Sequence, residues 1–200
     1  YLNVSLPSIF INIGGISNIT YLSKKNELIA FDSGPGMCLL DDYVERNSNK
    51  NYDEGGKYSS KGNINKKILK KVRRDKYFKL KYPKSIDRNY YTFIEFKKLD
   101  FYDACATISM FTVKSIIFGI NKINKNYESI YIMGGGSKNL FIQKELSKIT
   151  QKDVKSINTK GLKDLYIESQ AFAYLAVRSI SNFPISYPKT TGVNKPATGG

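Results

Sequence analysis

The chain has 200 residues, the size of one domain or of one lobe of a two-lobe protein. With 41% hydrophobic residues it can bury a core, and with no histidine it excludes imidazole bases, His-based triads and most zinc sites. Its two cysteines, Cys38 and Cys105, share no ligand or redox spacing and are expected to be reduced. Any chemistry must therefore use carboxylates, lysines, hydroxyls, backbone amides or a hard metal.

The net charge of +15 comes from 32 basic and 17 acidic residues. Such a charge suits nucleic acid or a membrane surface. A genome rich in A and T would also give this abundance of Lys, Asn, Ile and Tyr, and we favour that explanation. We expect no signal peptide, because the sequence shows no Met and no basic segment before an apolar stretch. The longest apolar run, 111–120, is too short for a membrane span, so a cytoplasmic protein is expected.

Three strands, predicted at 8–13, 17–22 and 27–31, open the fold and are followed by a helix at 38–46. Short connections make the strands antiparallel neighbours. The predicted elements that follow are a loop (47–62), a helix (65–74), an irregular stretch (77–91), a helix capped by Asp103 (103–119), a strand (129–133), a helix (139–149), a strand (154–157), a helix (164–181) and a surface tail (183–200).

This order predicts an α/β domain of the ribonuclease-H-like type, a mixed sheet flanked by helices. Actins, sugar kinases and heat-shock ATPases contain two such domains, so residues 1–182 are expected to form one actin-like lobe. Fold alone does not give function, which must come from the sites.

Two glycine-containing turns lie at strand ends in the first half of the chain. Gly14-Gly15, between Asn12 and Asn18, leaves backbone amides open to a phosphate oxygen, although a plain hairpin turn would look the same. Asp32-Ser33-Gly34-Pro35-Gly36 places a carboxylate and a helix start together, which suits a metal-bound water or an anion. A simple cap-and-turn cluster is the alternative.

A third turn and a helical carboxylate lie in the second half. Gly134-Gly135-Gly136, before Ser137, Lys138 and Asn139, joins a strand to a helix and lets a flat ligand approach the backbone, although it is not a P-loop. Glu168 falls on an apolar helical stripe with Leu165, Phe172 and Leu175, so a buried carboxylate with a ligand or a structural partner is expected.

A basic stretch at 66–81 carries Tyr77 and Phe78, with Tyr82 just beyond it. Basic and aromatic residues together can bind nucleic acid. We favour a solvated helix face with the aromatic rings packed inward.

The order of these motifs resembles the anhydro-N-acetylmuramic acid kinase family from about residue 9 to the end. The series consists of 12–18, 32–36, Pro83-Lys84-Ser85, 103–107, 134–139, 168–173 and Thr191-Gly192. The resemblance implies an ATP-dependent kinase of cell-wall recycling. Such an enzyme opens the 1,6-anhydro ring by hydrolysis and phosphorylates the 6-hydroxyl, giving N-acetylmuramic acid 6-phosphate.

The resemblance also implies site residues. Gly14 and Gly15 would face the ATP phosphates, Asp32 would lie by the phosphates and Mg²⁺, and Gly134 to Gly136 with Asn139 would line the adenosine site. Glu168 would lie near the sugar. Three further residues, Asn12, Gly34 and Gly36, are assigned to the nucleotide site and Asn18 to the sugar site.

The chain departs from the family pattern at two motifs. Met37 replaces an Asn after Gly-Pro-Gly, and 86–89 reads Ile-Asp-Arg-Asn in place of Thr-Gly-Arg-Glu. The family's first phosphate loop and its aspartate base are expected upstream of Tyr1, so the catalytic residue stays unassigned. The expected partners are ATP, the anhydro sugar and an absent N-terminal lobe, with a homodimer left open and membrane contact not expected.

Three hypotheses follow from the sequence. The first is the C-terminal half of such a kinase, inactive alone. The second is a folded but catalytically silent product of a split or degraded gene that binds only nucleotide. The third is a basic nucleic-acid-binding module.

Overall fold

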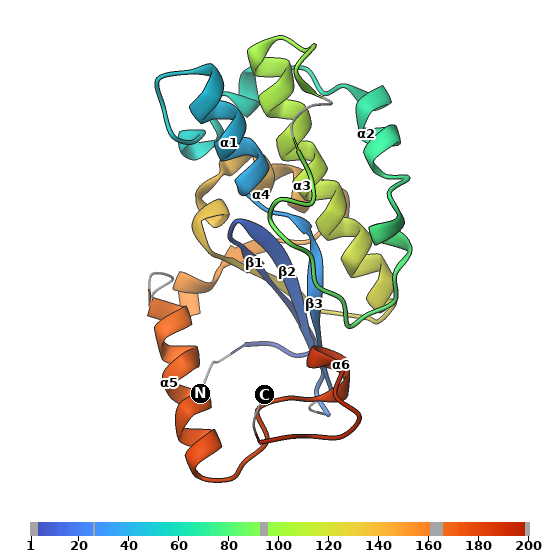
Figure 1. Cartoon of the computed structure of the whole chain (residues 1–200), viewed down its shortest axis with the longest axis vertical. Coiled ribbons are helices and arrows are strands. Elements are labelled where there is room, and N and C mark those ends of the chain that lie inside the picture. Colours follow the sequence, from blue (N-terminus) through green and yellow to red (C-terminus); the bar gives the residue numbers. More distant parts are fainter. Residues whose placement is uncertain (1–3, 26, 93–95, 161–165, 199–200) are drawn as a thin grey trace.

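A five-stranded sheet forms the centre of the molecule in the computed structural model, which describes residues 4–25, 27–92, 96–160 and 166–198 (Figure 1). The strand order is β3-β2-β1-β4-β5. The strands are β1 (Ser8–Ile13), β2 (Ile16–Leu22), β3 (Leu28–Pro35), β4 (Ser129–Met133) and β5 (Val154–Ser156). The first three strands pair antiparallel, as predicted, and β4 and β5 continue the sheet parallel to β1.

One face of the sheet carries the main core because apolar residues alternate along its strands. Ile9, Ile11 and Ile13 of β1 are fully buried on this face. Burying each side chain contributes about 1.5–3 kcal/mol. Helices α3 (Phe101–Ile123) and α4 (Leu140–Thr150) cover the face and complete this cluster.

A second apolar cluster lies on the half of α3 that extends beyond the sheet. Helices α1 (Cys38–Asn47) and α2 (Lys66–Val72) surround it with short 3-10 turns, which include Glu54–Gly56, Ser59–Lys61 and Lys76–Lys79 (Figure 1). Both Tyr77 and Phe78 are buried in this cluster, and Tyr82 stacks on Phe31 with ring centroids 5.3 Å apart. The aromatic rings of the basic stretch are thus packed inward.

The predicted cap of α3 at Asp103 is wrong. The helix begins at Phe101, and the Asp100 side chain accepts a hydrogen bond from the Tyr102 amide at 3.0 Å. Asp103 instead accepts from the Asn63 amide at 2.7 Å, which ties the preceding loop to the helix. At the other end α3 continues past Gly119 to Ile123, where Asn124 turns into the left-handed region.

Within the described residues, α3 is the one helix long and apolar enough by composition to cross a membrane. Its most apolar window is 78% buried inside the structure. Such burial is typical of the central helix of a folded core.

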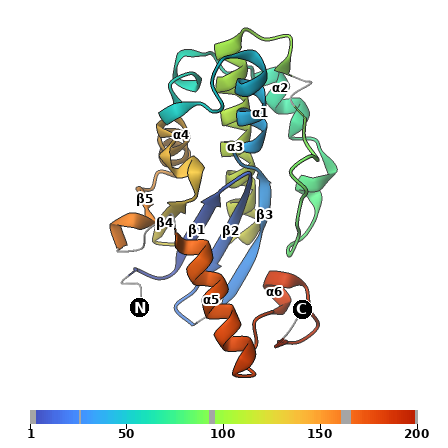
Figure 2. The same ribbon diagram turned by 60° about the vertical axis from the view of Figure 1, so that its left-hand side comes forward.

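Helix α5 (Ile167–Ile180) lies on the other side of the sheet from α3 (Figure 2). The predicted buried stripe on this helix is wrong at Phe172, which is 72% exposed, while Leu175 is half-buried. Local periodicity correctly gave a helix, but burial also needs an opposing surface, which the described residues do not supply. The expected start near residue 164 lies outside the described residues.

The tail is more ordered than the surface loop we predicted. It contains α6 (Pro188–Thr191) and an isolated bridge between Ser186 and Ala197. Lys189 of α6 forms an ion pair with Glu27, just before β3, at 2.7 Å. The tail therefore closes against β3 and becomes part of the site described next.

Candidate functional site

A row of polar side chains crosses three strands of the sheet. Asn12 of β1 is the register partner of Asn18 of β2, which in turn is the partner of Asp32 of β3. The strand β3 runs through Asp32 to Pro35, so the predicted strand end at Phe31 is wrong. The three residues are partly buried and alternate with the core residues, which places them on the face opposite α3.

Asp32 holds the loop that contains Lys84 and Ile86 against this row through hydrogen bonds. Its amide donates to the Lys84 carbonyl at 2.9 Å, and its Oδ2 accepts from the Ile86 amide at 3.0 Å. The Tyr77 hydroxyl donates to the Asp32 carbonyl at 2.7 Å. Burial raises the pKa of the Asp32 carboxyl, while the Ile86 hydrogen bond and the charge of Lys84 oppose that shift.

Lys84 was not among the predicted site residues. Its Nζ lies 3.8 Å from the centroid of the Tyr77 ring and donates to the Tyr77 carbonyl at 3.0 Å. Burial, helped by the charge of Lys122, lowers the pKa of Lys84 to about 8. The Pro-Lys-Ser motif was a signal for this residue, but the sequence could not show that the loop crosses β3.

The polar row opens into a cleft of about 490 Å³. Asn18, Asp32, Lys84 and Ser85 line it with the tail residues Thr190, Thr191 and Gly192. A wider cleft of about 900 Å³ continues from it between the outer face of β2 and β3 and helix α5. Carboxylate, ammonium, amide and hydroxyl groups thus face one cleft, a set suited to a polyhydroxylated or phosphorylated ligand.

The Gly14-Gly15 turn is hydrogen-bonded to the start of α1. The amides of Gly36 and Cys38 donate to the Gly15 carbonyl at 2.9 and 3.2 Å, and the Met37 amide donates to the Gly14 carbonyl at 2.8 Å. A Cβ on Gly36 would lie 2.2 Å from the Gly14 carbonyl oxygen, so this close approach requires glycine. These three amides already donate to backbone carbonyls. They are therefore not available to bind an anion at the start of α1, where an anion site was predicted.

Gly34 and Gly36 are both buried. At Gly34 an added Cβ would lie 2.7 Å from the Cβ of Ser115 on α3. Their burial favours a packing role, and their contact with nucleotide stays a prediction. Gly15, at the tip of the hairpin, is exposed.

The Gly134–Gly136 turn meets the polar row. Gly134 has a φ of 83°, and a Cβ there would lie 2.4 Å from Oδ1 of Asn12. Gly136 packs on Ile13 and on Met37, so the residue that departs from the family pattern serves as an apolar contact. Gly135 is exposed, with open space where a Cβ would point, and is the glycine of this turn most accessible to a ligand.

Asn139 is buried and caps α4, with its Oδ1 accepting from the Ile142 amide at 3.1 Å. Its Nδ2 has no hydrogen-bond partner among the described residues. The position of the Glu168 side chain lies outside what the structure describes, so its assignment to the sugar stays a prediction.

A metal ion could be held here only with help from a ligand. No group of three or more acidic or cysteine side chains with metal-binding geometry occurs in the described part of the chain. Mg²⁺ commonly uses one or two protein carboxylates together with substrate phosphates and water. Asp32, alone in its cleft, fits that pattern.

Comparison with known proteins identifies the family of this chain. The family model for anhydro-N-acetylmuramic acid kinase matches residues 4–200. Proteins named anhydro-N-acetylmuramic acid kinase from Phenylobacterium zucineum and Zymomonas mobilis are each 36% identical to the chain, over 97% and 100% of its length. The chain covers 53% and 55% of these proteins, so it spans about half the length of the curated relatives it matches.

The fold is also found among solved structures. The activator of the 2-hydroxyisocaproyl-CoA dehydratase from Clostridium difficile, solved with bound ADPNP, superposes with a TM-score of 0.51 at 12% identity. The match covers 87% of this chain and 64% of the activator. It confirms the predicted actin-like ATPase fold. With the family model matching nearly its whole length, the chain belongs to the anhydro-N-acetylmuramic acid kinase family.

Proposed function

We propose that this chain is the nucleotide-binding half of a sugar kinase. The whole enzyme would convert 1,6-anhydro-N-acetylmuramic acid and ATP to N-acetylmuramic acid 6-phosphate in the cytoplasm. The observation that carries the proposal is the polar row of Asn12, Asn18 and Asp32 beside the open turn at Gly135. The names of the relatives supply the substrate class.

Each part of the site has a role in this proposal. The Gly134–Gly136 turn would lie beside the adenosine, and the hairpin at Gly14-Gly15, which is exposed at Gly15, would face the phosphates. Asp32 would hold Mg²⁺, which supplies charge neutralisation at the transferring phosphoryl group. Lys84 would add positive charge to the same cleft and keep Asp32 oriented through the loop that it anchors. Glu168 and Asn18 would bind the sugar.

We further propose that the catalytic base comes from a second half that docks against this chain. Two observations support the proposal: the relatives are about twice as long, and α5 leaves large apolar side chains exposed. Exposed apolar patches of this kind mark interfaces. A homodimer through the same surface is the competing arrangement.

Nucleotide binding by the chain alone is the first test. In calorimetry we expect ATP to bind more tightly with Mg²⁺ than without it. The variant Asp32→Asn should lose this difference and still fold, because the Asn side-chain oxygen can accept from the Ile86 amide. The matched control, Asp87→Asn, removes an exposed carboxylate from the same loop and should behave as the unaltered chain. Failure of the unaltered chain to bind ATP would contradict the proposal.

The nucleic-acid hypothesis has a separate test. If the basic charge is compositional, binding to DNA or RNA should be weak and without sequence preference. A tight complex whose affinity falls steeply with increasing salt concentration would support the nucleic-acid hypothesis.

A further inference from the structure

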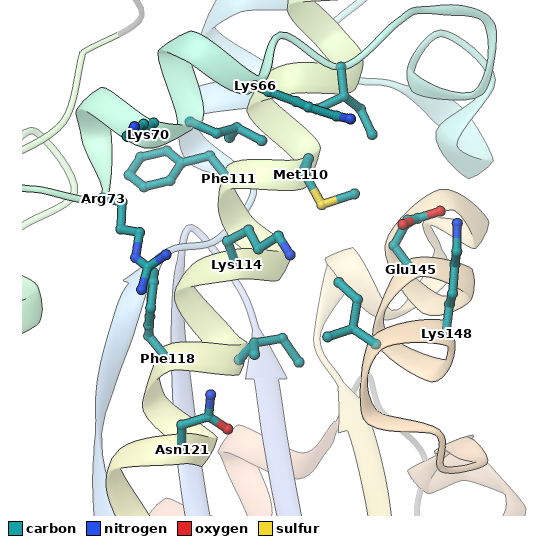
Figure 3. A pocket seen from close by; sticks show the side chains of 14 residues that line it. Lys66, Lys70, Arg73, Met110, Phe111, Lys114, Phe118, Asn121, Glu145 and Lys148 are labelled. Atoms are coloured by element: carbon teal, nitrogen blue, oxygen red, sulfur yellow. The ribbon is translucent and has the colours of Figure 1, made fainter.

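A second pocket lies on the helical side of the molecule, away from the polar row. It has a volume of about 660 Å³ and is enclosed by α2, α3 and the C-terminal half of α4 (Figure 3). Its lining includes the apolar side chains of Leu69, Met110, Ile117 and Ile149. None of the residues that we assign to nucleotide or sugar lines it, so it is a separate cavity.

Positive charge dominates the rim of this pocket. Five cationic side chains line it with a single carboxylate: Lys66, Lys70, Arg73, Lys114, Lys148 and Glu145. The cations come from α2 and its C-cap, from α3 and from α4, with Lys114 on α3 (Figure 3). Among the described residues none of the four lysines forms an ion pair.

Among the described residues, Arg73 is the one cation of the rim with a ring contact, 4.8 Å from the centroid of Phe118. That contact occupies part of the Phe118 ring, which is half-buried, and Phe111 is buried. The pocket therefore offers little aromatic surface on which a nucleic-acid base could stack. Its shape and lining fit a small molecule better, because pockets of about 300–1,000 Å³ with mostly apolar walls and a few polar groups are typical of small-ligand sites.

We propose that this pocket binds a small amphiphilic organic anion. The apolar or aromatic body of the ligand lies on the Met110–Ile117 floor, and its phosphate or carboxylate group contacts Lys114 and the lysines of the rim. Binding relieves the repulsion among like charges that the single carboxylate of Glu145 leaves uncompensated. The proposal does not depend on the kinase assignment.

The probes for the test are 1-naphthyl phosphate and 1-naphthoate, with 1-naphthol and inorganic phosphate as the body-only and head-only controls. The chain contains three methionines, and ¹³C-methyl NMR reports on each. We expect the two anionic probes to shift the Met110 methyl signal in a saturable manner and to leave those of Met37 and Met133 unchanged, since only Met110 lines the pocket. Each control should bind at least tenfold more weakly, because it lacks one half of the recognition.

A matched pair of variants locates the anion. Lys114→Gln keeps most of the side chain and removes its charge, and it should weaken 1-naphthyl phosphate about tenfold, the cost of one hydrogen bond to a charged group. Lys144→Gln makes the same change on α4 at a residue outside the pocket, and it should leave affinity unchanged. Circular dichroism checks that both variants fold.

Three results would overturn the proposal: an unmoved Met110 signal, naphthol binding as tightly as naphthyl phosphate, or equal effects of the two variants.

Discussion

Asp41 is a partly buried carboxyl whose charged form is disfavoured in this structure. It lies in the first turn of α1, and its Oδ1 is buried without a hydrogen-bond partner among the described residues. Burial, with the neighbouring charge of Asp42, raises the pKa of Asp41 to about 6 from an ordinary value of 3.8. A carboxyl whose pKa is higher in the folded state binds its proton more tightly when folded, so its ionisation costs stability as the pH rises from about 4 to about 6.

The variant Asp41→Asn should therefore raise the free energy of unfolding at pH 7 by about 1–2 kcal/mol, a range that allows for partial solvent screening. At pH 4 the gain should be much smaller. Urea unfolding at the two pH values measures both. Asp153→Asn, an exposed carboxylate paired with Lys155 at 3.6 Å, is the control and should change little. An equal gain at both pH values would show that the charge of Asp41 is not the cause.

Gly36, just before α1, and Gly135, in the turn after β4, differ in what surrounds them. Gly36→Ala should destabilise the fold by about 1–3 kcal/mol, because its Cβ would meet the Gly14 carbonyl oxygen and separate the hairpin from α1. Gly135→Ala makes the same chemical change in open space and should leave stability within about 0.5 kcal/mol of the unaltered chain. Thermal unfolding of both variants checks the pair. Similar losses of stability in the two variants would mean that the Gly14-Gly15 turn does not pack against the start of α1 as described.

At the scale of elements, α5 stands out because the chain's own core does not bury its large apolar side chains. Phe172, Val177 and Ile180 are each more than half exposed on it. They should drive self-association of the isolated chain.

Sedimentation of the double variant Phe172→Lys, Ile180→Lys should show less self-association than the unaltered chain. Stability should change by under about 0.5 kcal/mol because neither side chain is buried. The control Leu80→Lys replaces an apolar residue that is 50% exposed outside α5 and should leave self-association unchanged. A monodisperse monomer formed by the unaltered chain would contradict this account of α5.

Most elements could be predicted from local pattern. The alternating isoleucines of β1 fix a strand, and Asn65 and Asn139 cap α2 and α4 close to the predicted starts. Errors arose where a distant partner decides the outcome. The strand β3 extends through Asp32 because β2 pairs with it up to Pro35, and the α3 cap moves to Asp100 because Asp103 is used by Asn63.

The site was predictable in part for the same reason. Asn12, Asn18 and Asp32 were identified from their places near strand ends, and the register brings them into one row. Lys84 and the tail threonines enter the cleft through long loops whose path no local pattern encodes. The apolar periodicity of α5 indicated a helix and could not indicate what covers it.

At the scale of the whole molecule, the structure has a buried apolar core on the α3 side of the sheet and a polar row with open clefts on the other. A kinase needs both a nucleotide site and a base that activates the attacking water. We assign the first to this chain and expect the second from the other half of the enzyme.

The most direct test is ATP-dependent phosphorylation of 1,6-anhydro-N-acetylmuramic acid by this chain alone and by the chain mixed with a separately produced N-terminal half. The account predicts no turnover by the chain alone and N-acetylmuramic acid 6-phosphate formed by the mixture. Turnover by the isolated chain would contradict the assignment of the base to the other half. Absence of turnover in a mixture that binds both ATP and sugar would identify the chain as a silent nucleotide-binding product.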